Sequence, residues 1–226
     1  MTIQVQIRRA READIAAMSM IEVESFSDSP YHTALFPKEL RARPGIEEQL
    51  EWSSRHMSQA MKDPSSRYVV ATDGSNEAIL GFAEWVASKP RETTSQPTEK
   101  TAEESARAYQ EGLERLPAYL DKAAIVRCDD ETGQLLKAAR LFLGDKRLSD
   151  MWTLNSIAVA AMYRLKGIGK MLTRWGIDAA NEERRDIWLV SAPTGRSMYL
   201  SLGFKEVAVG IRAGEAQHLM FRETIG

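Results

Sequence analysis

The sequence has few of the residues and patterns that mark disulfide-linked, metal-dependent or membrane-spanning proteins. Cys128 is the only cysteine among 226 residues, which excludes an intramolecular disulfide and a four-cysteine zinc site. The three histidines are scattered, and no pair has the spacing of zinc ligands, so we expect no metal site. No apolar run approaches the ~20 residues of a membrane span. The first residues alternate and then become charged, so we expect no signal peptide.

The charges nearly cancel. Thirty Lys and Arg residues face 32 Asp and Glu residues, for a formal net charge of −2. This balance does not indicate a nucleic-acid or anionic-membrane partner. Hydrophobic residues make up 43% of the chain, which is enough to bury a sizeable core. We therefore expect a soluble, cytoplasmic protein that binds neither nucleic acid nor membrane.

The order of the expected elements indicates an α/β (α+β) fold. The first half contains a hairpin, and strands alternate with helices only in the second half, so the sheet should be mixed rather than purely parallel. Residues 27–45 contain three prolines and have loop character. Strands are expected at about 3–8, 67–72, 77–88, 151–160, 186–192, 204–211 and 217–223. Helices are expected at about 11–26, 45–63, 102–116, 133–143, from 166 onward, and 194–203.

The segment "RLKGIG", residues 164–169, joins an expected strand to an expected helix. The first N–H groups of a helix lack intrahelical partners and carry partial positive charge, and glycine lets a ligand approach the backbone. Such a turn suits a phosphate or pyrophosphate. The dinucleotide motif would need glycine where Leu172 stands. The P-loop motif would need other residues at Arg164 and Met171.

The pattern that fits is R-x-x-G-x-G, which resembles the acyl-CoA-binding motif of the GNAT superfamily, the GCN5-related N-acetyltransferases. The preceding "LNSIAV" (154–159) and the later "YLSLGF" (199–204) also resemble family segments. The resemblance covers the chain except for about residues 89–149. It implies one acetyltransferase domain over residues 1–226, with a mixed sheet of about seven strands flanked by helices. It also implies a helical insertion at about 89–149, where the family usually has a turn.

The resemblance further implies acetyl-CoA as co-substrate and no metal. The pantetheine arm would pair with a strand edge exposed between two splayed parallel strands, and the pyrophosphate would lie on the amides after Arg164. Ser191 stands where many members carry a cofactor-contacting asparagine. The implied cofactor-binding residues are Ile157, Ala158, Val159, Arg164, Leu165, Lys166, Gly167, Ile168, Gly169, Lys170 and Ser191.

For catalysis, the resemblance implies direct attack of an amine on the thioester. Tyr199 occupies the position of the family tyrosine that protonates the thiolate, although it would otherwise be a packing aromatic. Glu84 is our candidate base, because a carboxylate within an apolar run is unusual. The alternative is that Glu84 lies at a sheet surface. Asn155 and Asp150 are further candidates for binding substrate or positioning water.

The acceptor is expected to be a small-molecule amine, because no dense acidic cluster indicates a polybasic peptide. Tyr31, Phe36 and Trp85 should line an apolar pocket for it. We interpret His32 as a solvated loop histidine. A protein or peptide acceptor and a non-catalytic acyl-CoA-binding module remain alternatives.

The insertion also leaves several alternatives open. A long connection within a compact domain is either functional or disordered. This one could cover the acceptor side as a lid, or form a contact between two copies in a homodimer.

Overall fold

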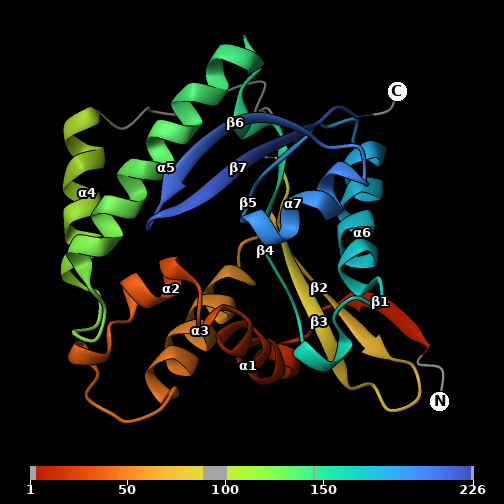
Figure 1. Ribbon diagram of the computed structural model, residues 1–226, viewed down its shortest axis with the longest axis horizontal. Helices are drawn as coiled ribbons and strands as arrows, with labels where there is room; N and C mark the ends of the chain where they lie inside the picture. Colours follow the sequence, from red (N-terminus) through yellow and green to blue (C-terminus); the bar gives the residue numbers. More distant parts are fainter. Residues whose placement is uncertain (1–3, 89–100, 145, 225–226) are drawn as a thin grey trace.

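The computed structural model describes residues 4–88, 101–144 and 146–224. Its centre is a seven-stranded sheet in the order β1-β2-β3-β4-β5-β7-β6 (Figure 1). The β4–β5 pair is parallel and the other pairs are antiparallel, which confirms the mixed sheet. Residue 3 of the expected first strand lies outside the described residues. The strands are β1 Val5–Arg9, β2 Ser66–Asp73, β3 Ile79–Val86, β4 Trp152–Val159, β5 Ile187–Ser191, β6 Lys205–Arg212 and β7 Glu215–Arg222.

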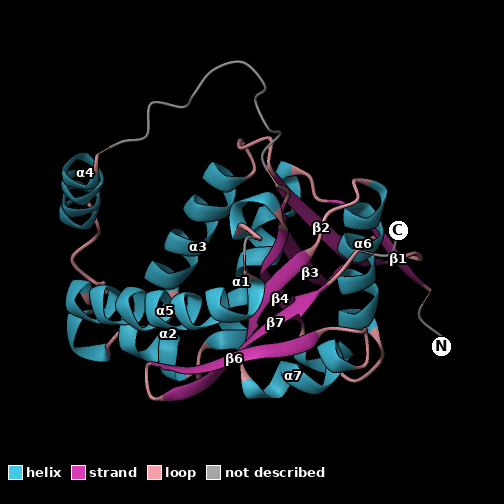
Figure 2. Cartoon of the chain, turned by 90° about the horizontal axis from the view of Figure 1, so that it is seen from above, coloured by secondary structure: helices cyan, strands magenta, loops and turns pink. Residues whose placement is uncertain are grey.

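Helices cover both faces of the sheet. In Figure 2, α1, α2, α3 and α5 lie on one side, and α6 and α7 lie on the other. Each side has its own apolar core, with Met18, Met57 and Phe82 in one and Leu172 and Leu189 in the other. The helices are α1 Ile15–Phe26, α2 Pro30–Leu35, α3 Glu47–Ala60, α4 Ala102–Glu114, α5 Lys122–Leu143, α6 Ile168–Glu182 and α7 Pro193–Leu200.

The side chains of successive β3 residues point to opposite faces of the sheet, as in any pleated strand. Phe82 packs in the core under α1 and α3, whereas Ala83 and Trp85 pack in the core under α6. Trp85 is 0% exposed, and a Cβ at Gly176 would lie 2.0 Å from its ring. Gly176 is therefore required for α6 to approach the sheet. Our prediction that Trp85 lines an acceptor pocket is wrong, because its strand position directs it to the other face.

The segment after α1 is more ordered than its three prolines indicated. Residues 30–35 form α2, and Lys38–Leu40 form a short 3-10 helix. The Ser29 hydroxyl accepts a hydrogen bond from the His32 amide at 3.1 Å, and Pro30 occupies the first turn. Proline is tolerated there because that N–H would have no helical partner. The prediction of a loop was wrong because these prolines flank the helix rather than interrupt it.

The insertion contains two helices, but the second is longer than expected. It begins at Lys122, where the Asp121 carboxylate caps the Ala124 amide at 2.9 Å. The helix continues through Gly133, which costs ~1 kcal/mol in a helix interior. Burial of the helix against β6 and β7 compensates for this cost through Leu135, Ala139 and Leu143. The described residues of α4 stay largely exposed. Residues 89–100 and 145 of the predicted insertion lie outside the described residues.

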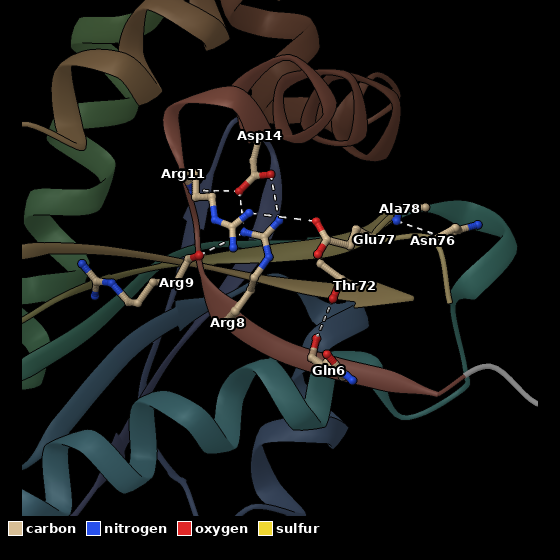
Figure 3. A network of polar contacts seen from close by, with 9 residues as sticks. All are labelled: Gln6, Arg8, Arg9, Arg11, Asp14, Thr72, Asn76, Glu77 and Ala78. Atoms are coloured by element: carbon tan, nitrogen blue, oxygen red, sulfur yellow. Dashed lines mark hydrogen bonds and ion pairs between the residues drawn. The ribbon is translucent and has the colours of Figure 1, made fainter. Parts of the chain in front are cut away.

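An ion pair ties β1 to the start of α1 (Figure 3). The Arg8 guanidinium donates to both carboxylate oxygens of Asp14, at 2.7 and 2.9 Å. The same carboxylate accepts from the Arg11 amide at 2.7 Å. The hydrogen bond from Arg8 lowers the pKa of Asp14, and the bond from the Arg11 amide adds to this effect. Asp14 is thus more stable as a carboxylate in the folded chain than in the unfolded one.

We expect Asp14→Asn to lower the free energy of unfolding by about 1–2 kcal/mol at pH 7, because charge-assisted hydrogen bonds are lost from a largely buried group. The depressed pKa means that this stabilisation is present above the ordinary value of 3.8 and disappears as the pH falls below it. Urea unfolding at pH 7 and at pH 3 measures both effects. Asp178→Asn, at an exposed position of α6, is the control. An equal effect of Asp14→Asn at both pH values would contradict the assignment.

Candidate functional site

The two parallel strands diverge towards their C-terminal ends. β4 pairs with β5 only over Trp152–Leu154, opposite Ile187–Leu189. Beyond Leu154, β4 continues to Val159 while pairing only with β3. The other edge of residues 157–159 therefore has no β-ladder partner. Such an edge can pair with an extended ligand.

A β-bulge lies at the point of divergence. Glu84 pairs with Ser156 and Trp85 pairs with Leu154, so Asn155 is the extra residue of β4. Bulges bend a strand and redirect a side chain. Here the Asn155 amide donates to Glu84 Oε2 at 2.8 Å.

The turn from β4 to α6 presents a row of backbone amides. Gly167 is the N-cap of α6, with φ of +83°, so the helix begins at Ile168, two residues later than expected. Among the described residues, the amides of residues 165–170 have no hydrogen-bond acceptor. Leu165 has φ of +61° and a fully exposed side chain. The turn thus combines free N–H donors with the positive end of the α6 dipole, as an anion site requires.

The Arg164 side chain holds this turn in place. Its Nε donates to the Val159 carbonyl at 3.0 Å, and Nη2 donates to the Ser25 hydroxyl at 3.0 Å. These bonds fasten the turn to the end of β4 and to α1. Gly169 lets the turn approach α7, since a Cβ there would lie 3.1 Å from Met198 Sδ.

A cavity of about 490 Å³ lies beside the diverging strands. Tyr31 and Phe36 line it as expected, together with Trp52, Tyr68 and Phe26. Its polar lining includes Glu22, His32, Gln49, Ser53, His56, Glu84, Asn155, Ser156, Ser191, Thr194, Tyr199, Arg212, Glu215 and Gln217. The site therefore combines an aromatic wall with several titratable groups.

Glu84 is a buried member of this lining, with 8% of its surface exposed. It lies between Tyr68 on β2 and Ser156 on β4 in the strand register. Besides the Asn155 bond, its charge acts on Tyr68, its register partner on β2: burial, followed by the negative charges of Glu84 and Glu22, raises the pKa of the Tyr68 phenol. Glu84 is thus a fixed acceptor on the cavity wall rather than a residue on a solvated sheet surface.

Glu22 on α1 is a second carboxylate that we did not identify from the sequence. Its Oε2 accepts from the Ser53 hydroxyl at 2.5 Å, and its Oε1 accepts from Ser156 at 3.4 Å. Burial is the main cause of its raised pKa, and the negative charge of Glu84 raises it further. The only sequence signal was its place among apolar residues of α1, since Ile21 and Val23 are both buried.

Tyr199 on α7 reaches the cavity from the opposite core. Its ring packs edge-on against Phe204, with centroids 5.7 Å apart, and is 5% exposed. Its hydroxyl has no hydrogen-bond partner in the part of the chain that the structure describes. Burial raises the pKa of this phenol, so it stays protonated.

The remaining predicted site residues lie in different places. Ser191 ends β5 and lines the cavity, and its hydroxyl donates to the Ala192 carbonyl at 2.7 Å. His32 is half-buried on α2, stacked on Phe36 at 4.7 Å, and burial lowers its pKa. It is therefore not the solvated loop histidine that we expected. Asp150 does not line the cavity.

The insertion supports the cavity from behind. No described residue of 101–150 lines it, so these residues do not form a lid over it. Instead, Leu120 and Cys128 pack against Leu35 and Phe36 of the α2 segment. The Asp121 amide also donates to the Leu35 carbonyl at 3.0 Å.

Among the described residues, no helix is long and apolar enough to cross a membrane, and no group of three acidic, His or Cys side chains could hold a metal.

We expect Glu22→Gln to stabilise the fold at pH 7 by about 0.5–2 kcal/mol, since it removes a charge that burial disfavours while keeping an oxygen for Ser53. Because the folded pKa of Glu22 is raised, the wild type loses stability as the pH rises from 4.5 through that pKa. At pH 4 the two proteins should therefore be nearly equal in urea unfolding. Glu24→Gln, at an exposed position of the same helix, is the control. A stability difference that does not change with pH would refute the assignment.

The chain is similar in sequence and fold to known acetyltransferases. A family model described as "Acetyltransferase (GNAT) family" matches residues 26–204. A protein named "Acetyltransferase" from Stachybotrys chartarum is 23% identical over 207 residues, covering 89% of this chain and 80% of that protein. A structure of histone acetyltransferase HPA2 and related acetyltransferase from Corynebacterium glutamicum superposes with a TM-score of 0.62 and 17% identity, covering 99% of this chain and 98% of that one. A GCN5-related N-acetyltransferase from Kribbella flavida gives a TM-score of 0.55 and 19% identity, covering 97% of each chain. Since the family model spans more than half of its residues, the chain belongs to the acetyltransferase (GNAT) family and is an N-acetyltransferase.

Proposed function

We propose that this enzyme transfers an acetyl group from acetyl-CoA to a primary amine of a small molecule bound in the cavity. The observation that carries the proposal is the arrangement of Glu22, Glu84 and Tyr199 around one cavity beside the diverging strands. Its volume of about 490 Å³ lies within the ~300–1,000 Å³ of typical small-molecule sites.

The donor side of the site fits an acyl-CoA. The free edge of Ile157, Ala158 and Val159 supplies main-chain groups for the pantetheine arm, which enters where β4 leaves β5. Ser191 borders the same opening. The free amides of residues 165–170 at the start of α6 are our proposed site for the pyrophosphate. Because the Arg164 side chain is bonded to Val159 and Ser25, its role is to shape this turn.

The carboxylates serve the acceptor side. An amine arrives mostly as ammonium and must lose a proton before it can attack a carbonyl carbon. Glu84, held by the Asn155 amide, accepts that proton directly or through water. Glu22 adds negative charge nearby, which attracts the ammonium group.

Tyr199 serves the leaving group. Its hydroxyl is free of protein partners among the described residues, so it can donate to a sulfur at the opening between the strands. Because burial raises its pKa, the phenol keeps its proton until negative charge develops on the sulfur. Attack of the neutral nitrogen forms the C–N bond, the C–S bond breaks, and the thiolate takes the Tyr199 proton. The second proton that the nitrogen loses on becoming an amide restores the Tyr199 phenol through water.

The function is tested by calorimetric titration with acetyl-CoA, followed by thiol release with a panel of small amines and peptides. We expect acetyl-CoA to bind and small amines to give turnover. Turnover with peptides alone would favour a protein acceptor. Binding without any turnover would favour a non-catalytic module, and absence of binding would reject the proposal.

We expect Tyr199→Phe to lower kcat by about 100-fold or more, because a general acid contributes ~10²–10⁴-fold. The dissociation constant for acetyl-CoA should change by less than about threefold, since the ring that packs on Phe204 is kept. Stopped-flow thiol release and calorimetry measure the two quantities. Tyr109→Phe, which removes an exposed hydroxyl bonded to Asp129 outside the cavity, is the matched control. Unchanged kcat for Tyr199→Phe would exclude it as the acid.

A further inference from the structure

Arg212 is the last residue of β6, an edge strand of the sheet, whereas Glu84 lies on β3 and Glu22 on α1. Figure 1 shows the β6–β7 turn reaching towards α2 and α5. The Arg212 guanidinium lies over the Tyr31 ring of α2, 4.3 Å from its centroid. Both residues line the cavity.

The Arg212 guanidinium has few hydrogen-bond acceptors and no ion-pair partner among the described residues. Arginine carries five N–H donors. One hydrogen bond is present, from Nη2 to Gln217 Oε1 at 3.2 Å, and the buried Nε has no partner. Within the described residues, no carboxylate forms an ion pair with Arg212. Arg212 is half-buried and lines the cavity without an ion-pair partner among the described residues, so a bound anion could neutralise its charge there.

The arginine is also held in a fixed orientation. Gln217, which is 2% exposed, accepts from it and is itself bonded to Glu215 Oε2 at 3.3 Å and to the Ala216 carbonyl at 3.1 Å. The guanidinium carbon also lies over the Tyr31 ring. The remaining donors lie along the edge of the plane, where a carboxylate binds in a two-pronged fashion.

We propose that the acceptor is an amine that also carries a carboxylate, and that Arg212 binds this carboxylate. This inference rests on the proposed function and names its substrate class. The ammonium group lies at Glu22 and Glu84, and the carbon body contacts aromatic walls such as Trp52 and Phe36. The site thus matches a substrate with opposite charges on an apolar body. A site built to bond a polar group discriminates strongly against analogues that lack it.

The test compares amines that differ only in the carboxylate. We would measure kcat/KM for 4-(2-aminoethyl)benzoate and phenylalanine, each against phenethylamine. In the wild type, at least one of the two carboxylate-bearing amines should be favoured by about tenfold or more. Arg212→Gln should bring that ratio close to one. Arg140→Gln, at an exposed position of α5, should leave the ratio intact.

The inference would be overturned if the Arg212→Gln variant kept the wild-type preference in kcat/KM for carboxylate-bearing amines, or if the wild type had no such preference. Either result would leave the proposed function in place. If acetyl-CoA binds but no amine in the panel is acetylated, the proposed function itself fails. If the Arg212→Gln variant does not fold, the test is inhibition of the wild-type enzyme by analogues that lack the amine. We expect 3-phenylpropanoate to compete with the amine at least about tenfold better than 3-phenylpropanamide, and equal competition would overturn the inference.

Discussion

The site depends on the early end of one β-ladder. After three residue pairs, β4 and β5 separate, because the bulge at Asn155 bends β4. The separation leaves a strand edge without a ladder partner, and it also lets Tyr199, which belongs to the core under α6, reach a cavity on the other face. A continuous parallel ladder would satisfy these backbone groups and close the passage. The separation of β4 and β5 therefore connects the proposed acetyl-CoA site at the strand edge with the proposed acceptor site in the cavity.

The Glu84 and Glu22 carboxylates of the cavity are hydrogen-bonded to neighbouring side chains. Glu84 accepts from Asn155, whereas Glu22 accepts from Ser53 and Ser156. Even so, the charge of Glu22 is disfavoured by burial. A residue that costs folding stability yet lies in a cavity is typical of functional sites, where stability and activity compete. The burial of Glu22 thus fits the role that we propose for it at the acceptor side.

The sequence predicted the features that depend on local pattern. Strand periodicity and turn residues were sufficient for the mixed sheet, and the resemblance around "RLKGIG" indicated the family that the comparisons establish. The misses depend on three-dimensional packing. Trp85 and Glu84 are neighbours in sequence, and the pleat decides which of them faces the cavity. Glu22 and Arg212 line the same cavity only because the fold brings α1, α2 and β6 together. The spacing of these residues along the chain does not predict that arrangement.

If the turn before α6 holds the pyrophosphate of acetyl-CoA on its amides, as we propose, a negative charge at Gly167 should weaken binding, and the acetyl-CoA affinities of two Gly167 variants measure this effect. Asn and Asp both tolerate the positive φ of this position, and a Cβ there meets nothing within 4 Å. The two side chains have the same size and differ in charge. We expect Gly167→Asp to bind acetyl-CoA at least about tenfold more weakly than Gly167→Asn, because a carboxylate repels the pyrophosphate. Equal affinities of the two variants for acetyl-CoA would show that the pyrophosphate does not bind at this turn.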